Sequence, residues 1–420
     1  MRYGREWLEV ELPRKNLVAV LEMPEGLAPL GRERIERGLD EPIGSAGLEE
    51  LCRGKREACV LVSDVTRPVP NREILPPLLS RLEGCGIPRD GISLLIATGL
   101  HRVNTPHELE EMLGGTIARG YRVVSHNSRD RGMAKDLGTT KRGTPVVVNR
   151  IYAESELKVG TGLIEPHLMA GFSGGRKAIC PGMCYPETVR VLHGPRLLES
   201  PLATCGLLAG NPLHEELTEV ARTVGMDFLV NVVNDRQRRP VGVFAGDMEA
   251  AFLQGADFCR KAVEARVPEA VDVVVTSSAG YPLDTTYYQS IKGIVGALPI
   301  LKPGGTIVMA AGCEEGLGSP EFTDLLLSMP DLETFEKRLW SDGFFVVDQW
   351  QLQELAKARK TAEVLVFTDN LDADLRKRLL VPCVGSVEEG VEMALRRCGP
   401  DATLAAIPEG PYVLPRVGEA

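Results

Sequence analysis

ACVLVSDVTRP, at residues 58–68, joins a short run of apolar, β-branched side chains to a cluster of polar and charged ones. ISLLIATGLHR, at residues 92–102, repeats the same design. An apolar run this short predicts a buried strand, and the amphipathic segment Arg72–Gly84 between the two stretches predicts a helix. A strand, a helix and a second strand in this order indicate a βαβ unit of a parallel sheet.

The alternation of strands and helices continues on both sides of these two stretches. Helices are predicted at Thr105–Gly114 and Met248–Ala265. Further strands are predicted at Leu17–Leu21, Tyr121–Val124, Pro145–Asn149, Leu157–Gly160, Phe228–Val233, Val271–Ser277, Gly305–Ala311, Phe344–Val347 and Glu363–Thr368. We therefore expect an α/β protein with two α/β domains, each built on a mostly parallel, doubly wound sheet. A hinge at Val267–Ala270 predicts domains at residues 1–266 and 267–420, with the active site in the cleft between them.

Composition and charge exclude several classes of protein. The 420 residues are 44% hydrophobic and 25% charged, which is typical of a globular chain. A net charge of −10 argues against a nucleic-acid binder, which needs a basic face. We find no long apolar run for a membrane span and no secretory leader, and the ten cysteines form no C-x-x-C pair. These features predict a cytoplasmic protein with reduced thiols.

Polar motifs follow three of the predicted strands. They are Ser63–Pro68, Thr98–Arg102 and Gly160–His167. Ligands of open α/β sheets bind beyond the carboxyl ends of strands, so three such motifs predict one shared cleft. His101 and His167 lie in these motifs and are candidates for catalysis. The other histidines are expected to be solvated or to cap helices, and these are His107, His126, His214 and, at a helix C-terminus, His193.

The longest motif is EPHLMAGFSGGRK, at residues 165–177. Its glycines let backbone N–H groups converge, and Arg176 and Lys177 add positive charge, so the loop is a candidate anion cradle. It is not a Walker A loop, because arginine precedes the lysine and alanine follows it. In the second domain, Gln289 and Lys292 are three residues apart, and on one helix face they could hold a small carboxylate.

Taken together, these motifs resemble those of the nickel-pincer-nucleotide-dependent lactate racemase family, which comprises 2-hydroxyacid racemases and epimerases. The resemblance spans both domains. It is carried by D-x-T-R-P at residues 64–68, T-G-x-H-R at 98–102, the long motif at 165–177, V-x-H-G at 191–194 and Q-x-x-K at 289–292.

The resemblance implies a role for each candidate residue. Lys177 would carry the cofactor covalently, as a pyridinium-3-thioamide-5-thiocarboxylate mononucleotide that holds nickel, and His193 would ligate the nickel. Cofactor binding would also involve Asp64, Ser173, Gly174, Gly175 and Arg176. His101 and His167 would be paired acid/base groups. The carboxylate of the 2-hydroxyacid substrate would be bound by Arg67, Gln289 and Lys292.

The resemblance also implies the chemistry and the partners. A hydride would pass reversibly from the substrate α-carbon to the cofactor, and its return to the other face would invert the centre. Proteins that synthesise and insert the cofactor would be partners. Two other functions stay open on the residues alone. One is a zinc- or iron-dependent hydrolase or lyase that uses His101, His167 and His193. The other is a non-catalytic nucleotide- or cofactor-binding protein.

Overall fold

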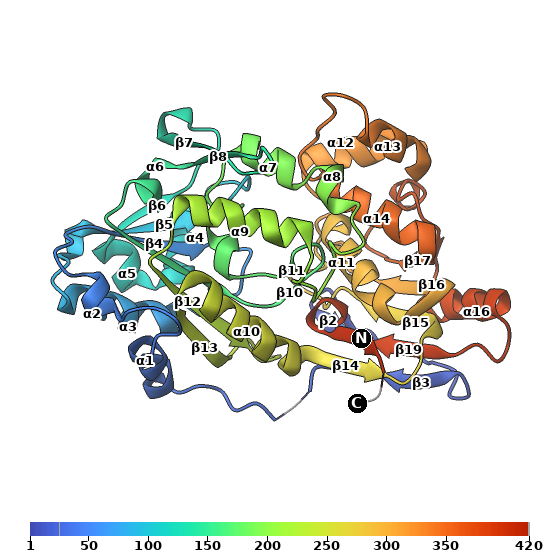
Figure 1. Cartoon of the computed structure of the whole chain (residues 1–420). Helices are drawn as coiled ribbons and strands as arrows, with labels where there is room; N and C mark the ends of the chain where they lie inside the picture. Colours follow the sequence, from blue (N-terminus) through green and yellow to red (C-terminus); the bar gives the residue numbers. More distant parts are fainter. Residues whose placement is uncertain (25, 419–420) are drawn as a thin grey trace. The chain divides into compact units, whose positions relative to one another are not determined.

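The chain forms two compact units in the computed structural model, which describes residues 1–24 and 26–418 (Figure 1). The N-terminal unit comprises Gly26–His193 and Ser200–Ala262. The C-terminal unit comprises Met1–Glu25, Gly194–Glu199 and Val263–Ala420. No helix of the described residues is long and apolar enough to span a bilayer.

The N-terminal unit is built on a six-stranded sheet. Its strands lie in the order β13 (Pro240–Gly246), β12 (Phe228–Asn234), β9 (Leu157–Leu163), β4 (Ala58–Ser63), β5 (Ile92–Ala97) and β6 (Arg122–Ser125). All neighbours are parallel except β12 and β13, which pair as an antiparallel edge. The central strands β4, β5 and β9 are buried almost throughout, as expected for a parallel sheet covered on both faces, whereas the edge strand β6 is partly exposed.

Apolar side chains from five helices cover one face of this sheet. The helices are α1 (Arg32–Asp40), α2 (Leu48–Leu51), α3 (Asn71–Gly84), α4 (Pro106–Leu113) and α5 (Gly115–Gly120). The start of α4 is encoded locally, because Thr105 and Glu108 form a capping box. Further helices of the unit are α6 (Arg150–Ala153), α7 (Pro186–Leu192), α9 (Pro212–Val224) and α10 (Met248–Val263), with the 3-10 turns η1 (Arg89–Gly91), η2 (Arg131–Met133) and η3 (Gly175–Ala178).

Two small antiparallel hairpins complete the N-terminal unit. One joins β7 (Ala134–Thr139) to β8 (Pro145–Asn149), and the other joins β10 (Pro166–His167) to β11 (Gly171–Phe172). The predicted strand at Pro145–Asn149 therefore exists, but it belongs to a hairpin and not to the parallel sheet. The second hairpin carries His167.

The C-terminal unit has its own six-stranded sheet, and all of its neighbours are parallel. Its order is β18 (Cys383–Val384), β17 (Glu363–Phe367), β16 (Leu301–Ala310), β15 (Val271–Ser277), β19 (Leu404–Ile407) and β3 (Leu17–Val20). Short two-stranded pairs join β14 (Glu264–Val267) to β20 (Leu414–Val417) and β1 (Arg2–Tyr3) to β2 (Glu6–Trp7). Its helices are α8 (Pro195–Leu198), α11 (Tyr287–Ala297), α12 (Pro320–Ser328), α13 (Leu332–Leu339), α14 (Gln349–Thr361), α15 (Ala373–Arg376) and α16 (Val387–Cys398), with the 3-10 turns η4 (Leu298–Ile300) and η5 (Gly410–Tyr412).

The structure corrects two details of the predicted strands and domains. The first residues of the chain belong with the C-terminal part, because β3 pairs with β19, and so the N-terminal domain does not begin at residue 1. The predicted strand at Phe344–Val347 is absent, and this segment leads directly into α14. An apolar run alone does not show that a segment forms a strand, because it does not identify the strand that would pair with it.

His126 is wholly buried, although a solvated or capping position was expected. Its Nε2 donates to the carbonyl of Cys184 at 3.1 Å, and its Nδ1 accepts from the amide of Asn149 at 3.1 Å. Burial lowers the pKa of His126 from 6.5 to about 4, against the smaller opposing effect of the bond to Cys184. The ring is thus a neutral part of the core.

This burial predicts an acid-sensitive contribution to stability. The unfolded chain takes up a proton at His126 below about pH 6.5 and the folded chain does so only near pH 4, so the free energy of unfolding falls as pH falls between these values. Urea unfolding of the wild type and of H126Q should show the stability difference between them shrinking by about 3 kcal/mol across that range. H107Q is the matched control, because His107 is exposed. A difference that does not change with pH would contradict the neutral buried ring.

Candidate functional site

The predicted polar motifs lie at the carboxyl edge of the N-terminal sheet. Asp64 follows β4 directly, and the turn Thr98–Arg102 follows β5. The strand β9 runs further than predicted, to Leu163, and leads to the hairpin that carries His167. Because β4, β5 and β9 are parallel, their ends present these motifs at the same edge of the sheet.

Asp64 and His101 form a direct pair at this edge. The Nδ1 atom of His101 lies 2.7 Å from Oδ2 of Asp64, and Thr66 donates its hydroxyl to Oδ1 at 2.6 Å. Burial raises the pKa of Asp64, but the hydrogen bond and charge of His101, with the charge of Arg67, outweigh it and leave the pKa below its ordinary value. The ionised carboxylate therefore keeps a proton on Nδ1 of His101, and Nε2 is the nitrogen that can accept another.

The turn that carries His101 is tied to the segment that follows Lys177. The N–H of Gly99 donates to the carbonyl of Gly182 at 2.8 Å, and the N–H of Gly182 donates to the carbonyl of Lys177 at 3.3 Å. Gly99 has φ of 57° and packs on the backbone of Pro181, which a side chain would disturb. Two backbone hydrogen bonds thus connect the His101 turn to Lys177.

His193 and Lys177 are electrostatic neighbours. His193 is the last residue of the turn that ends α7, and its Nδ1 lies 3.2 Å from the carbonyl of Val189. Burial lowers the pKa of His193 to about 3, with a further contribution from the charge of Lys177 and a smaller opposing one from Val189. His193 is therefore a neutral imidazole whose Nδ1–H is held by the helix, which is the state a metal ligand requires.

His167 accepts hydrogen bonds at its Nδ1. The donors are the backbone N–H groups of Met169 and Ala170, at 3.3 and 3.2 Å. The side chain is half-buried in the β10–β11 hairpin. His101 and His167 therefore use the same ring atom in opposite ways, as donor and as acceptor.

The glycine loop is packed into the protein more tightly than an open anion cradle would be. The N–H of Gly175 donates to Oδ1 of the buried Asn231 at 2.7 Å, and the hydroxyl of Ser173 is bonded to the carbonyl of Leu163 at 2.8 Å. Gly174 and Gly175 have φ of 79° and 54°, and a Cβ on either would lie within 2.8 Å of a neighbour. Packing alone thus accounts for both glycines.

Arg176 is also turned into the protein. Its guanidinium donates to the carbonyls of Ala170 at 2.8 Å and Gly174 at 3.3 Å, and it lies 4.2 Å from the ring of Phe252. Only 1% of the side chain is exposed, and burial lowers its pKa to about 9. The hydroxyl of Ser173, the N–H of Gly175 and both terminal nitrogens of Arg176 are bonded to protein atoms, and only Nε of Arg176 is buried without a partner among the described residues. This placement favours a framework role for the three residues.

The C-terminal unit positions Gln289 and Lys292 on the first turns of α11. Thr286 caps this helix by accepting the N–H of Gln289 at 3.3 Å. Both side chains are half-buried, and Oε1 of Gln289 is buried with no hydrogen-bond partner among the described residues. Such an atom calls for a polar ligand or water, which agrees with a binding role. The neighbouring Tyr288 accepts a hydrogen bond from Nε1 of Trp350 at 2.9 Å.

Sequence reasoning missed two polar residues of the N-terminal unit, Asn211 and Asn231. Both are fully buried, and each holds backbone of the long motif. Asn231 stands in the apolar strand FLVNVVN, where an amide is costly unless it is bonded, and that interruption is a usable signal. Asn211 reads only as a helix cap.

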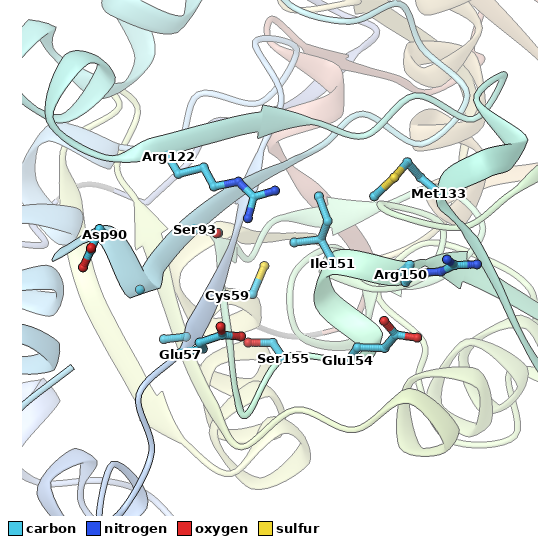
Figure 2. Close-up of a pocket in the computed structure, with 12 residues that line it drawn as sticks. Glu57, Cys59, Asp90, Ser93, Arg122, Met133, Arg150, Ile151, Glu154 and Ser155 are labelled. Carbon is cyan, nitrogen blue, oxygen red and sulfur yellow. The ribbon is translucent and has the colours of Figure 1, made fainter. Parts of the chain in front are cut away.

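A separate hollow of about 260 Å³ lies at the amino edge of the same sheet, away from these motifs (Figure 2). It is bordered by the first residues of β4, β5 and β6. Figure 2 shows Arg122 extending from β6 toward Cys59. Acidic and basic side chains line this hollow, and none of the predicted site residues is among its lining residues.

The three candidate metal-binding histidines do not form one cluster. Among residues 1–24 and 26–418, no group of three His, Cys, Asp or Glu side chains is arranged to hold a metal ion. A zinc or iron centre made by His101, His167 and His193 together therefore lacks a structural basis.

Comparison with known proteins identifies the family. The chain matches the lactate racemase N-terminal domain over residues 3–206 and the lactate racemase C-terminal domain over residues 267–414. It is 36% identical over 381 residues to the lactate racemase of Lactiplantibacillus plantarum, covering 90% of this chain and 89% of that protein. It is 32% identical to the lactate racemase of Thermoanaerobacterium thermosaccharolyticum, covering 99% and 98%. The chain belongs to the lactate racemase family and is an isomerase.

Solved structures confirm the predicted fold. The lactate racemase apoprotein from T. thermosaccharolyticum superposes with a TM-score of 0.93 at 32% identity, and 99% of each chain is covered. A protein from Thermotoga maritima, 17% identical, matches with a TM-score of 0.70 over 94% of this chain and 100% of its own, which supports the fold alone.

The role of Asn231 predicts a measurable loss of stability. N231L keeps the size of the side chain but leaves the N–H of Gly175 buried without an acceptor, which should cost about 1–3 kcal/mol of unfolding free energy. Urea unfolding measures the loss, and hydrogen exchange at Gly175 should become faster. V230A, an ordinary core truncation in the same strand, should destabilise the chain without selectively exposing that amide. Unchanged exchange at Gly175 in N231L would contradict this role.

Proposed function

We propose that this protein is a racemase or epimerase of a 2-hydroxyacid such as lactate. The observation that carries the proposal is the Asp64–His101 pair, which is joined through two backbone bonds to the segment of Lys177. The family relationship supplies the reaction class. A proton acceptor on a turn that is tied to the backbone of the proposed cofactor lysine suits proton transfer from the hydroxyl of a small acid.

We propose Lys177 and His193 as the residues that hold a nickel-pincer nucleotide. The chemistry of the two side chains fits, because His193 is neutral and presents one imidazole nitrogen, and Lys177 is the nearby amine. Ser173, Gly174, Gly175 and Arg176 shape the backbone that carries Lys177, and the donors to the nucleotide phosphate are unassigned. When bound, this cofactor supplies a reversible acceptor for hydride.

The remaining residues of the proposed site bind substrate and move its proton. The Nε2 atom of His101 takes the hydroxyl proton as the α-hydrogen leaves, and His167 serves the hydroxyl of the opposite enantiomer. Asp64 orients His101 and stabilises its cation. Arg67, Lys292 and the amide N–H of Gln289 bind the substrate carboxylate. The unpartnered Oε1 of Gln289 needs a hydrogen-bond donor, which the hydroxyl of the substrate could supply.

The two alternatives have less support. A zinc or iron hydrolase would need a cluster of ligands that the described residues do not form. A non-catalytic carrier would explain Lys177 but not the buried carboxylate that holds His101 in a proton-accepting form.

A chiral assay tests the proposed reaction. Holoenzyme from a host that makes the cofactor should convert either enantiomer of lactate, or of another 2-hydroxyacid in a panel, to the racemate. H101A should lower kcat about 10²- to 10⁴-fold, because the proton acceptor is lost. H107A, which removes an exposed histidine, should leave kcat unchanged. Near-native racemisation by H101A would eliminate the assigned base.

Intact-mass measurement tests the proposed anchor independently of turnover. The holoprotein should carry a covalent adduct and about one nickel per chain, and K177A should lose the adduct. H193A should keep the adduct but lose nickel affinity, since only the metal ligand is removed. An adduct that survives K177A would move the attachment elsewhere. Metal without any adduct in holoprotein would favour the hydrolase.

A further inference from the structure

We propose that Asn211 is a positioning residue for His167, that Arg176 assists it, and that they hold the ring in the tautomer opposite to that of His101. The catalytic meaning of this inference rests on the proposed role of His167, whereas the positioning itself rests on hydrogen bonds within the N-terminal unit. All of the residues involved lie in the long motif or at the start of α9.

The tautomer of His167 follows from the donors at its Nδ1. The N–H groups of Met169 and Ala170 both point to that atom, so it must present a lone pair. The neutral ring therefore carries its proton on Nε2. A proton on Nδ1 would face two N–H groups at hydrogen-bond distance, which is repulsive.

Asn211 controls the peptide unit that makes the shorter of these two bonds. Its Nδ2 donates at 2.9 Å to the carbonyl of Met169, which belongs to the same planar peptide as the N–H of Ala170. In a trans peptide the C=O and N–H point in opposite directions, so a donor on the oxygen also aims the N–H. By holding the carbonyl oxygen of Met169, Asn211 thus orients the N–H of Ala170 in the same peptide, and with it the hydrogen bond to His167.

The orientation of the Asn211 amide is itself determined. Its Oδ1 accepts the N–H groups of Leu213 and His214 at 3.0 and 3.2 Å, as the N-cap of α9. Its Nδ2 donates a second bond to the carbonyl of Leu207 at 3.0 Å. The side chain is wholly buried and a flipped amide would turn donors against donors, so α9 fixes which end faces Met169.

Arg176 fixes the next peptide along the chain. Its guanidinium donates to the carbonyl of Ala170 at 2.8 Å. Two fully buried side chains therefore hold the two carbonyls that follow the N–H donors to His167. Arg176 therefore has a structural role, holding the loop backbone, that does not require a bound phosphate.

The contrast with His101 gives the arrangement its chemical meaning. Asp64 keeps the proton of the neutral His101 ring on Nδ1, so Nε2 is an acceptor. His167 has the reverse arrangement, with an N–H at Nε2. At rest the pair thus offers one acceptor and one donor. In these resting tautomers, Nε2 of His101 takes the hydroxyl proton and the Nε2–H of His167 donates a hydrogen bond to oxygen. For His167 to accept the hydroxyl proton of the opposite enantiomer, its own proton must first shift from Nε2 to Nδ1.

Nitrogen-15 spectra of the histidine rings test the inference directly. The full-length chain is labelled at histidine and recorded at alkaline pH, where neutral rings report their tautomers, and H101Q and H167Q assign the two signals. We expect His167 with its proton on Nε2 and His101 with its proton on Nδ1. A wild-type His167 with its proton on Nδ1 would overturn the inference without the need for any further variant.

Two substitutions at residue 211 test the positioning role. N211D and N211S keep an oxygen that can cap α9. The aspartate has no donor for the carbonyl of Met169, and the single O–H of the shorter serine cannot replace both N–H bonds of the Asn211 amide. The ring signals of His167 should therefore no longer show a proton on Nε2 alone in either variant. In the holoenzyme, kcat should fall about tenfold with little change in KM. R176Q keeps an N–H donor for the carbonyl of Ala170, so its His167 ring signals should show the proton on Nε2 more clearly than those of R176A do.

T105A is the matched control, because it removes the N-cap of α4 in the same unit without touching the long motif. It should destabilise the chain and leave the ring signals of His167 unchanged. Ring signals unchanged in N211D and N211S would reject the positioning role, whatever the activity. Because the spectra need no turnover, failure of the racemase proposal and failure of this inference are separate results.

Discussion

The parallel register of β4 and β5 is the constraint on which the candidate site depends. Ser63 and Ala97 are paired at the ends of these strands, so Asp64 and the turn of His101 leave the sheet side by side. Their hydrogen bond of 2.7 Å is a consequence of this pairing. A slip of one residue would turn Asp64 to the other face of the sheet and separate the two groups.

Buried polar side chains hold the loops that follow these strands in place. Asn231, Asn211 and Arg176 are almost fully buried, and each makes at least one hydrogen bond to a backbone atom of the long motif. A loop without regular structure has backbone groups that need partners, and a buried amide or guanidinium can supply them where no strand is adjacent. The segment from His167 to Lys177 is thereby held by the core.

The two catalytic candidates, His101 and His167, are the same type of residue in different hydrogen-bonding environments. A carboxylate faces Nδ1 of His101, and two N–H groups face Nδ1 of His167. An enzyme that acts on both mirror images needs a group for each, yet the protein around those groups is not symmetric. Their chemical difference resides in their hydrogen-bond partners, because the imidazole itself is the same in both.

The sequence by itself determined the α/β class, most strands and helices, and the motifs that follow β4, β5 and β9, since these depend on local periodicity and on residue order. It also indicated the family, because its long motif is specific. Only the tertiary structure decided that β3 joins the C-terminal sheet, that His126 is buried, and that Ser173, Gly175 and Arg176 face inward. A local sequence pattern shows which side chains are apolar and at what spacing apolar residues recur. The partner of a strand, an amide or a guanidinium lies many residues away, and only the folded chain brings the two together.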